Sequence, residues 1–346
     1  MKGPKKLLAL IGTLVIVGAM LMPLAVFGDT EDTATGTFSN NNVPNITSVE
    51  LWNISGPAEV TAMTPQVTYD VRVKVTDADG LADLTTIVVK IYRDTDASAD
   101  ETEFNAESAD TQNCAVITWT QSGDLFSIAP SSSTTWGFTE VDCVTGTADS
   151  GTAFQFKFTV GKVATEAAGA ATDCWRVAAL VTDDSSGTDF GFDVSDNSMA
   201  WYGEISGVSG TVDWGTVNAG MAIGEGAPSE KTLGVTVKYL ANGPYDEKVK
   251  SDATWPDVPD NTADATLDED GLTLASNAFS LKADDTATLG SEVFVTVAGV
   301  AIDESGTQTA EAGHDAADNT LWLQLASTFI KDTYSGTITY IIANGS

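Results

Sequence analysis

The sequence predicts an all-β protein with two tandem antiparallel Greek-key (immunoglobulin-like) β-sandwiches after an N-terminal signal peptide. Three observations lead to this fold class. The chain has 346 residues, which is enough for two domains with cores of their own. Short segments in which apolar and polar residues alternate recur along both halves, separated by clusters of Gly, Asp, Asn and Ser. Helical periodicity is rare, and only the Ala-rich segment 163–171 is a candidate for a helical turn.

The N-terminus has the parts of a signal peptide. Three lysines within the first six residues precede an apolar run over residues 7–27, and the small residue Gly28 lies before an acidic one. We therefore expect residues 1–28 to be removed and the protein to be secreted, extracellular or associated with the cell surface. An uncleaved anchor is the alternative, because the run is long enough to span a bilayer, but Pro23 disfavours it. No later apolar run has the length of a membrane span.

Residues 29–43 contain one large aromatic side chain, Phe38, and we expect them to form an extended tail. The first sandwich is expected over residues 44–198. In residues 71–75 and 154–160 the alternation is unbroken, which places the apolar side chains on one face of a strand. Further strands are expected at 48–54, 85–92, 115–120, 125–128 and 175–182.

The polar stretch 183–198 is interpreted as the joint between the domains. The second sandwich is then expected over residues 199–346. Its strands are expected at 201–205, 232–239, 278–282, 292–297, 321–325 and 337–342. Clusters of Gly, Asp and Asn and the Pro-containing loop 255–259 separate them.

Both halves resemble known surface-protein domains. Residues 44–49 (Pro-Asn-Ile-Thr-Ser-Val) and 73–81 (Val-Lys-Val-Thr-Asp-Ala-Asp-Gly-Leu) are similar to the opening of immunoglobulin-like domains of prokaryotic, particularly archaeal, surface proteins. Residues 212–220 (Val-Asp-Trp-Gly-Thr-Val-Asn-Ala-Gly) and 334–340 (Tyr-Ser-Gly-Thr-Ile-Thr-Tyr) resemble β-sandwich domains of WxL-type and other envelope or fibre-forming proteins. A clear pair of Trp-x-Leu motifs is missing, which argues against peptidoglycan attachment. The resemblance implies a role at the cell surface or in an appendage.

The charge excludes one class of partner. Asp and Glu number 49 against 16 Lys and Arg, which gives a formal net charge of -33. Nucleic acid is excluded as a partner, because phosphate recognition depends on clustered Lys and Arg. Anionic lipid surfaces are disfavoured for the same reason. Since 42% of the residues are hydrophobic, the acidic residues are expected to coat a folded body.

Catalytic motifs are scarce in the sequence. The one histidine, His314, lies in a polar segment, and no Gly-x-Ser-x-Gly elbow accompanies it, which disfavours a Ser-His-Asp mechanism. Phosphate-binding glycine patterns are also missing. A glycoside hydrolase needs only two carboxylates, a condition that 49 acidic residues meet too easily to be informative. We therefore expect a protein that is not an enzyme, with a carboxylate-based glycoside hydrolase as the least favoured alternative.

The three cysteines allow at most one disulfide within the chain. Cys114 and Cys143 both lie in polar, turn-rich stretches and are the expected pair. Cys174 directly precedes Trp175 and is expected to be a buried thiol.

Acidic turns supply candidate calcium sites, because Ca²⁺ prefers six to eight oxygen ligands. None of them completes an EF-hand loop. The alternative is that Asp and Gly favour turns and that acidic residues keep the surface soluble. The candidate sets are Asp77, Asp79 and Asp83 around Gly80; Asp94, Asp96 and Asp100; and Asp268, Glu269 and Asp270 before Gly271.

Two tryptophans are candidates for carbohydrate binding. Trp136 and Trp255 lie in segments with loop character, whereas Trp119 and Trp175 lie on alternating strands and are expected in the core. An extracellular carbohydrate-binding module is therefore one functional hypothesis.

The leading hypothesis is a secreted, non-enzymatic structural protein: an envelope, adhesion or filament subunit that associates with itself or with other envelope proteins. Edge strands of antiparallel sheets carry unpaired N–H and C=O groups to which a strand from a neighbour can add. Residues 33–39, in which small and polar side chains alternate around Phe38, are the candidate donor strand.

Overall fold

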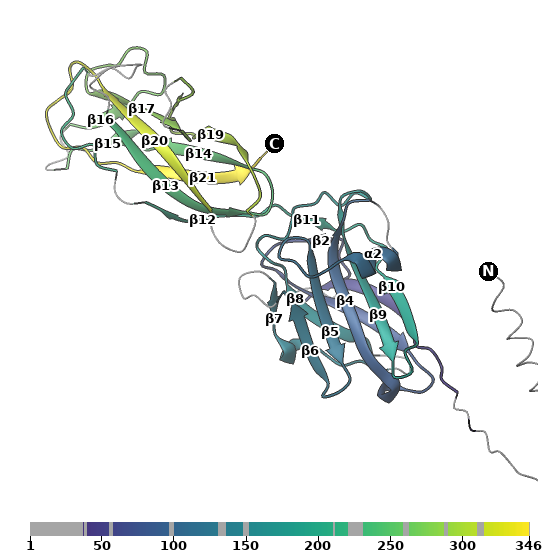
Figure 1. Ribbon diagram of the computed structural model, residues 1–346. Coiled ribbons are helices and arrows are strands. Elements are labelled where there is room, and N and C mark those ends of the chain that lie inside the picture. Colours follow the sequence, from purple (N-terminus) through teal and green to yellow (C-terminus); the bar gives the residue numbers. More distant parts are fainter. Residues whose placement is uncertain are drawn as a thin grey trace, which may run out of the picture. The chain divides into compact units, whose positions relative to one another are not determined.

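The computed structural model describes residues 37, 40–54, 58–96, 100–130, 136–147, 152–209, 212–220, 231–258, 263–286, 290–309 and 315–345. Strands dominate these residues, and α2 (Glu101–Ala106) is the one α-helix among them, so the predicted all-β fold is confirmed (Figure 1). No helix in the described ranges has the length and apolar character needed to cross a bilayer. The predicted signal peptide, His314 and residues 29–36, 38 and 39 of the predicted tail, with most of the candidate donor strand, lie outside the described residues.

The first half of the chain forms two antiparallel sheets and a short parallel pair (Figure 1). The strand orders are β1-β3-β8-β7 and β10-β9-β4-β5-β6, and β2 pairs with β11 in parallel. The bounds are β1 (Asn45–Asn53), β2 (Ala62–Met63), β3 (Thr68–Thr76), β4 (Leu84–Asp94), β5 (Cys114–Thr120), β6 (Leu125–Ala129), β7 (Gly137–Phe138), β8 (Phe154–Thr159), β9 (Cys174–Asp183), β10 (Thr188–Phe192) and β11 (Ser198–Met199).

The two larger sheets of this half enclose one hydrophobic core. Alternation along β3 and β8 turns Val71 and Phe156 inward, as predicted, where they meet side chains such as Ile117 of the facing sheet. Edge-on ring contacts cross the interface: the ring centroids of Trp119 on β5 and Phe154 on β8 are 4.9 Å apart. This half is therefore a β-sandwich.

The second half forms two more sheets (Figure 1). The larger has the order β12-β13-β20-β17-β16-β15, with β18 also paired to β17, and the smaller has the order β19-β14-β21. The bounds are β12 (Gly203–Val208), β13 (Lys231–Ala241), β14 (Tyr245–Ser251), β15 (Thr254–Trp255), β16 (Ala265–Leu267), β17 (Ala278–Asp284), β18 (Val293–Phe294), β19 (Val300–Gly306), β20 (Asp315–Leu325) and β21 (Ile338–Asn344).

A second, separate core lies between these sheets. Val237 on β13 and Leu321 on β20 face Val249 on β14 and Tyr340 on β21. The described core thus divides into one cluster drawn from residues 49–199 and another drawn from residues 214–340. The exact domain limits and the Greek-key connectivity stay predictions.

Candidate functional site

The turn between β3 and β4 brings three predicted calcium ligands together. Gly80 has φ 90° and ψ 179°, a conformation essentially restricted to glycine, and it leads into the 3₁₀ turn η1 (Leu81–Asp83). The chain therefore folds back sharply. One carboxylate oxygen from each of Asp77, Asp79 and Asp83 lies within 4.8 Å of the other two.

Two carboxylate oxygens of this turn lack a hydrogen-bond donor. Asp77 is 7% exposed, and its Oδ1 accepts the N–H of Asp79 at 2.8 Å, but its Oδ2 has no hydrogen-bond partner. The buried Oδ2 of Asp83 has none either. The pKa of Asp83 is raised to about 6, chiefly by burial and then by a side-chain contact with Asp184 and the charges of Asp184, Asp77 and Asp183. The site is therefore rich in negative charge.

The second acidic set differs from the prediction by one residue. Oxygens of Asp94, Asp96 and Glu103 lie within 4.8 Å of one another. Asp100 does not join them, because its side chain caps α2 and accepts the N–H of Glu103 at 2.9 Å. Asp94 is fully buried and accepts a hydrogen bond from Nε of Arg176 at 2.9 Å, so an arginine already compensates its charge.

In the third acidic set the carboxylates of Asp268 and Glu269 accept hydrogen bonds from backbone N–H groups. Oδ1 of Asp268 accepts the N–H groups of Asp270 and Gly271, at 3.2 and 2.8 Å. Glu269 reaches away and accepts the N–H of Val297 at 2.7 Å. Among the described residues the structure does not gather these carboxylates into a cluster, and the turn-forming alternative fits them.

The two tryptophans predicted to stack on sugars are buried. Trp136 is 1% exposed and packs on Trp175 and Phe158, with ring centroids 5.6 and 6.0 Å apart, so the prediction of an exposed platform is wrong for it. Trp255 is 8% exposed, and its Nε1 donates to Ser251 Oγ at 3.1 Å. Trp255 is not an exposed platform either, because core packing offers an aromatic ring more apolar contact than solvent does, and its part in carbohydrate binding stays a prediction.

Trp255 nevertheless borders a cavity of about 1170 Å³ in the second sandwich. Trp214, Phe279, Tyr334 and Tyr340 line it together with Trp255, alongside polar groups of the chain. Concave sites that combine aromatic walls with a few polar groups are typical of small-molecule binding sites. The cavity is therefore the place where the carbohydrate hypothesis can be tested.

All three cysteines are free thiols, so the predicted disulfide between Cys114 and Cys143 is wrong. Cys114 lies on β5 in a small outer cluster with Tyr92 and Phe104, whereas Cys143 packs against the inner core of the sandwich. The two thiols thus belong to different layers. Burial raises the pKa of Cys114 to about 12 and that of Cys143 to about 11, which makes both poor nucleophiles. Cys174 is buried, as predicted.

The polar stretch 183–198 is not the joint between the sandwiches. It contains β10 and β11, which pair with β9 and β2, and the buried Asn197 donates from Nδ2 to the carbonyl of Trp175 at 3.1 Å. Polar contacts between the two halves lie elsewhere. They involve Gln112, Asn113 and four segments that we call the joint: 162–167, 200–204, 241–245 and 307–309.

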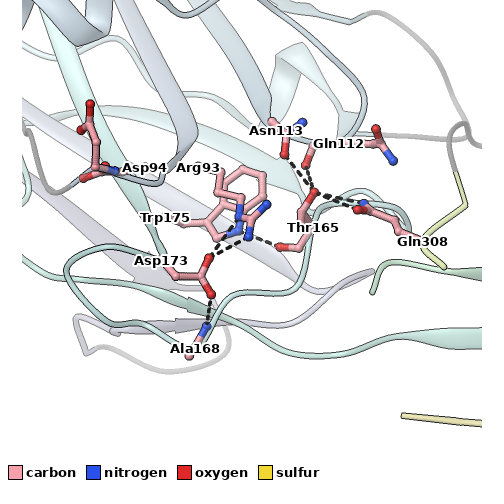
Figure 2. A network of polar contacts seen from close by, with 10 residues as sticks. Arg93, Asp94, Gln112, Asn113, Thr165, Ala168, Asp173, Trp175 and Gln308 are labelled. Atoms are coloured by element: carbon pink, nitrogen blue, oxygen red, sulfur yellow. Dashed lines mark hydrogen bonds and ion pairs between the residues drawn. The ribbon is translucent and has the colours of Figure 1, made fainter. Parts of the chain in front are cut away.

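Thr165 is a centre of contacts in the joint (Figure 2). Its hydroxyl lies 2.9 Å from Asn113 Oδ1 and accepts a hydrogen bond from Nε2 of Gln308 at 3.0 Å. Its carbonyl accepts the Nε1–H of Trp175 at 2.9 Å, which fixes the segment to the first core. Nε2 of Gln112 donates to the carbonyl of Thr309 at 3.0 Å. Side chains of the first sandwich and the loop after β19 are therefore joined directly.

Asn242, directly after β13, is a second centre and is completely buried. Its Nδ2 donates to the carbonyls of Ala164 at 2.7 Å and Ala200 at 3.0 Å. Its Oδ1 accepts the N–H of Tyr202 at 2.7 Å, and its carbonyl accepts the N–H of Glu166 at 3.0 Å. One amide side chain thus satisfies backbone groups on both sides of the joint. Local sequence does not reveal this role, because the partners of Asn242 are distant in the chain.

No protein-family model matches the chain, and no curated protein matches it significantly. The function is therefore inferred from the residues and their geometry.

Proposed function

We propose that the protein is a secreted, non-enzymatic structural protein of the cell surface, an envelope, adhesion or filament subunit. The observation that supports this most directly is the buried, hydrogen-bonded joint. Relative motion is the default for two domains in one chain. Buried polar groups that satisfy one another oppose such motion, because separating them leaves unpaired donors and acceptors. A subunit that must carry load or fit into a lattice needs this coupling.

Assembly through backbone pairing is the mechanism that we favour. With a formal net charge of -33, surfaces of two copies repel, so association needs specific, directional contacts. Among the described strands, β12 pairs only with β13, and β21 pairs only with β14, which leaves one edge of each for an added strand. Residues 33–39, from the tail that precedes β1, are the proposed donor strand.

Deletion of residues 29–41 tests this mechanism. We expect the parent protein to form polymers in negative-stain electron microscopy and the deletion variant to remain monomeric. The melting temperature should be unchanged, because the deletion keeps β1 and Asn42, which bonds to Asp79. Replacement of the same residues by a Gly/Ser segment of equal length is the control for length and should behave as the deletion does. A deletion variant that polymerises like the parent would remove the tail from the mechanism. If the parent protein stays monomeric and soluble and does not sediment with the cell envelope, the structural proposal is wrong.

The cavity lined by Trp214 and Trp255 favours a second candidate function, an extracellular carbohydrate-binding module. We expect any glycan-array signal of the parent to disappear in Trp255→Phe, which shortens the cavity wall while keeping an aromatic core residue. Trp52→Phe, in the first sandwich, is the matched control and should keep the signal. The absence of any signal from the parent contradicts this function. Release of reducing sugar from a bound glycan would instead support a carboxylate-based hydrolase.

A further inference from the structure

Three carboxylates meet in the turn after β3 without a compensating positive charge. Asp77, Asp79 and Asp83 each contribute an oxygen to a group whose members lie within 4.8 Å of one another. In the described part of the chain, none of the three forms an ion pair with Lys or Arg. Like charges at such separations repel, and burial strengthens the repulsion by lowering the local dielectric constant. The folded turn therefore needs a positive partner.

We propose that this turn is a divalent-cation site that takes Ca²⁺, a property beyond the structural role proposed above. An observation independent of the clustering supports it. Asp77 is 7% exposed, and its Oδ2 has no hydrogen-bond partner. Buried polar atoms are nearly always satisfied, so a bare carboxylate oxygen inside an acidic group indicates a position that a bound cation completes. The orphaned Oδ2 of Asp83 is a second such atom in the same turn.

The second acidic set shows what a compensated cluster looks like in the same protein. There, the buried Asp94 accepts a hydrogen bond from Arg176 at 2.9 Å, and Arg176 also pairs with Asp196. In that set the guanidinium of Arg176 already supplies the positive charge. The contrast favours the Asp77 turn, where no basic side chain among the described residues takes this place.

The ligand chemistry favours calcium over other metals. All three side chains offer carboxylate oxygens, which hard cations prefer, and the set contains no thiolate or imidazole for zinc or copper. Two ligands on opposite sides of one Ca²⁺ are about 4.8 Å apart at the usual bond length, so an ion can reach all three oxygens from a central position. Mg²⁺ demands shorter bonds and stricter octahedral geometry than a turn with only three side-chain ligands supplies.

Calcium bound here would also secure the start of the first strand. Asp79 accepts hydrogen bonds from the backbone N–H of Asn42, at 2.7 Å, and from its side-chain Nδ2. The N–H of Asp184, which follows β9, donates to the carbonyl of Asp83 at 2.8 Å. The turn thus contacts two other segments at one end of the sandwich, and fixing it is expected to stabilise all three.

Calorimetric titration of chelator-treated protein with CaCl₂ tests the proposal. We expect one binding event and a rise in melting temperature on adding calcium, because a ligand that binds only the native state raises stability. Asp77→Asn keeps the side-chain shape and the acceptor for the Asp79 N–H, and it should weaken calcium binding at least about tenfold. The matched control, Asp96→Asn in the second set, should bind calcium as the parent does.

Each other result counts against the site. A parent protein without calcium-dependent heat or thermal shift overturns the proposal, and so does an Asp77→Asn variant with the parent's affinity. If Asp77→Asn does not fold, Asp79→Asn, at an exposed position, should show the loss with an unchanged circular dichroism spectrum. If Asp79→Asn binds calcium with the parent's affinity, or if only Asp96→Asn loses calcium binding, the ion binds at another site and the proposal is wrong.

Discussion

Asn242→Ala is expected to lower the free energy of unfolding by about 3 kcal/mol, among the largest effects of any single substitution in the joint. The variant loses the bonds from Nδ2 to Ala164 and Ala200 and the bond that Oδ1 accepts from Tyr202. These three backbone groups then lose their partner at a site where Asn242 is 0% exposed, so water cannot replace the amide without rearrangement. Each orphaned group costs about 1–3 kcal/mol.

Chemical denaturation and hydrogen exchange check this expectation. The amide hydrogens of Glu166 and Tyr202, which bond to Asn242, should exchange faster in the variant than in the parent. Asn344→Ala is the matched control, because Asn344 is exposed and reaches the same joint through a single bond to Glu166 at 3.3 Å. It should change stability by less than about 0.5 kcal/mol. Equal effects of the two substitutions would show that Asn242 does not couple the sandwiches.

Strands β8 and β14 show which patterns the sequence made readable: β8, whose two faces differ, was predicted, and β14, which carries a buried charged residue, was not. In β8 each inward residue is aromatic and each outward residue is polar, so period-two alternation identifies the strand directly. In β14 the inward positions include Tyr245, Glu247 and Val249. A glutamate at an inward position looks like a surface residue in the sequence, and no strand was predicted there.

The same distinction explains the outcome at the candidate sites. Asp77, Asp79 and Asp83 lie within one turn, so their proximity follows from local sequence. Glu103 was missed, because it reaches the second acidic set only through the short helix α2, which lacks a periodic pattern. The burial of Trp136 and the bonds of Asn242 depend on residues between about 40 and 80 positions away, which local patterns do not identify.

We expect the stability of the protein to depend on pH through the buried side chain of Glu247. Its side chain is buried between the sheets of the second sandwich, where Oε1 accepts the Nδ2–H of Asn319 at 2.5 Å. Its Oε2, Oδ1 of Asn319 and the hydroxyl of Tyr340 are all buried without hydrogen-bond partners. The pKa of Glu247 is raised to about 7, chiefly by burial and also by the charges of Asp303 and Asp285, despite the hydrogen bond from Asn319.

This shift fixes the sign of the pH dependence. The carboxyl group titrates near pH 4.5 in the unfolded chain and near pH 7 in the folded protein, so between these values only the folded state holds the proton. The contribution of Glu247 to stability is therefore fully present below about pH 4.5 and is lost as the pH rises to about 7. A difference of about 2.5 pKa units corresponds to about 3 kcal/mol.

Glu247→Gln should remove this dependence, because the neutral amide presents a permanent donor. Where the protonated acid can donate from Oε2 to the orphaned Oδ1 of Asn319, the Gln side chain can do so with Nε2 at every pH. We expect the free energy of unfolding of the variant to exceed that of the parent by about 3 kcal/mol at pH 8 and to equal it near pH 4. Denaturant unfolding at pH 4, 6 and 8 measures the difference.

Glu304→Gln is the control for that series, since it removes the same charge from an exposed position on the neighbouring strand β19. Groups such as Asp83, whose pKa is also raised, titrate in the parent and in both variants and cancel from the comparison. The difference in free energy of unfolding between Glu247→Gln and the parent should grow from pH 4 to pH 8. If it does not grow, Glu247 is ionised in the folded protein at low pH, and a donor to Oε2 must balance its buried charge. If the difference grows as expected, one buried acid weakens the second sandwich at neutral pH.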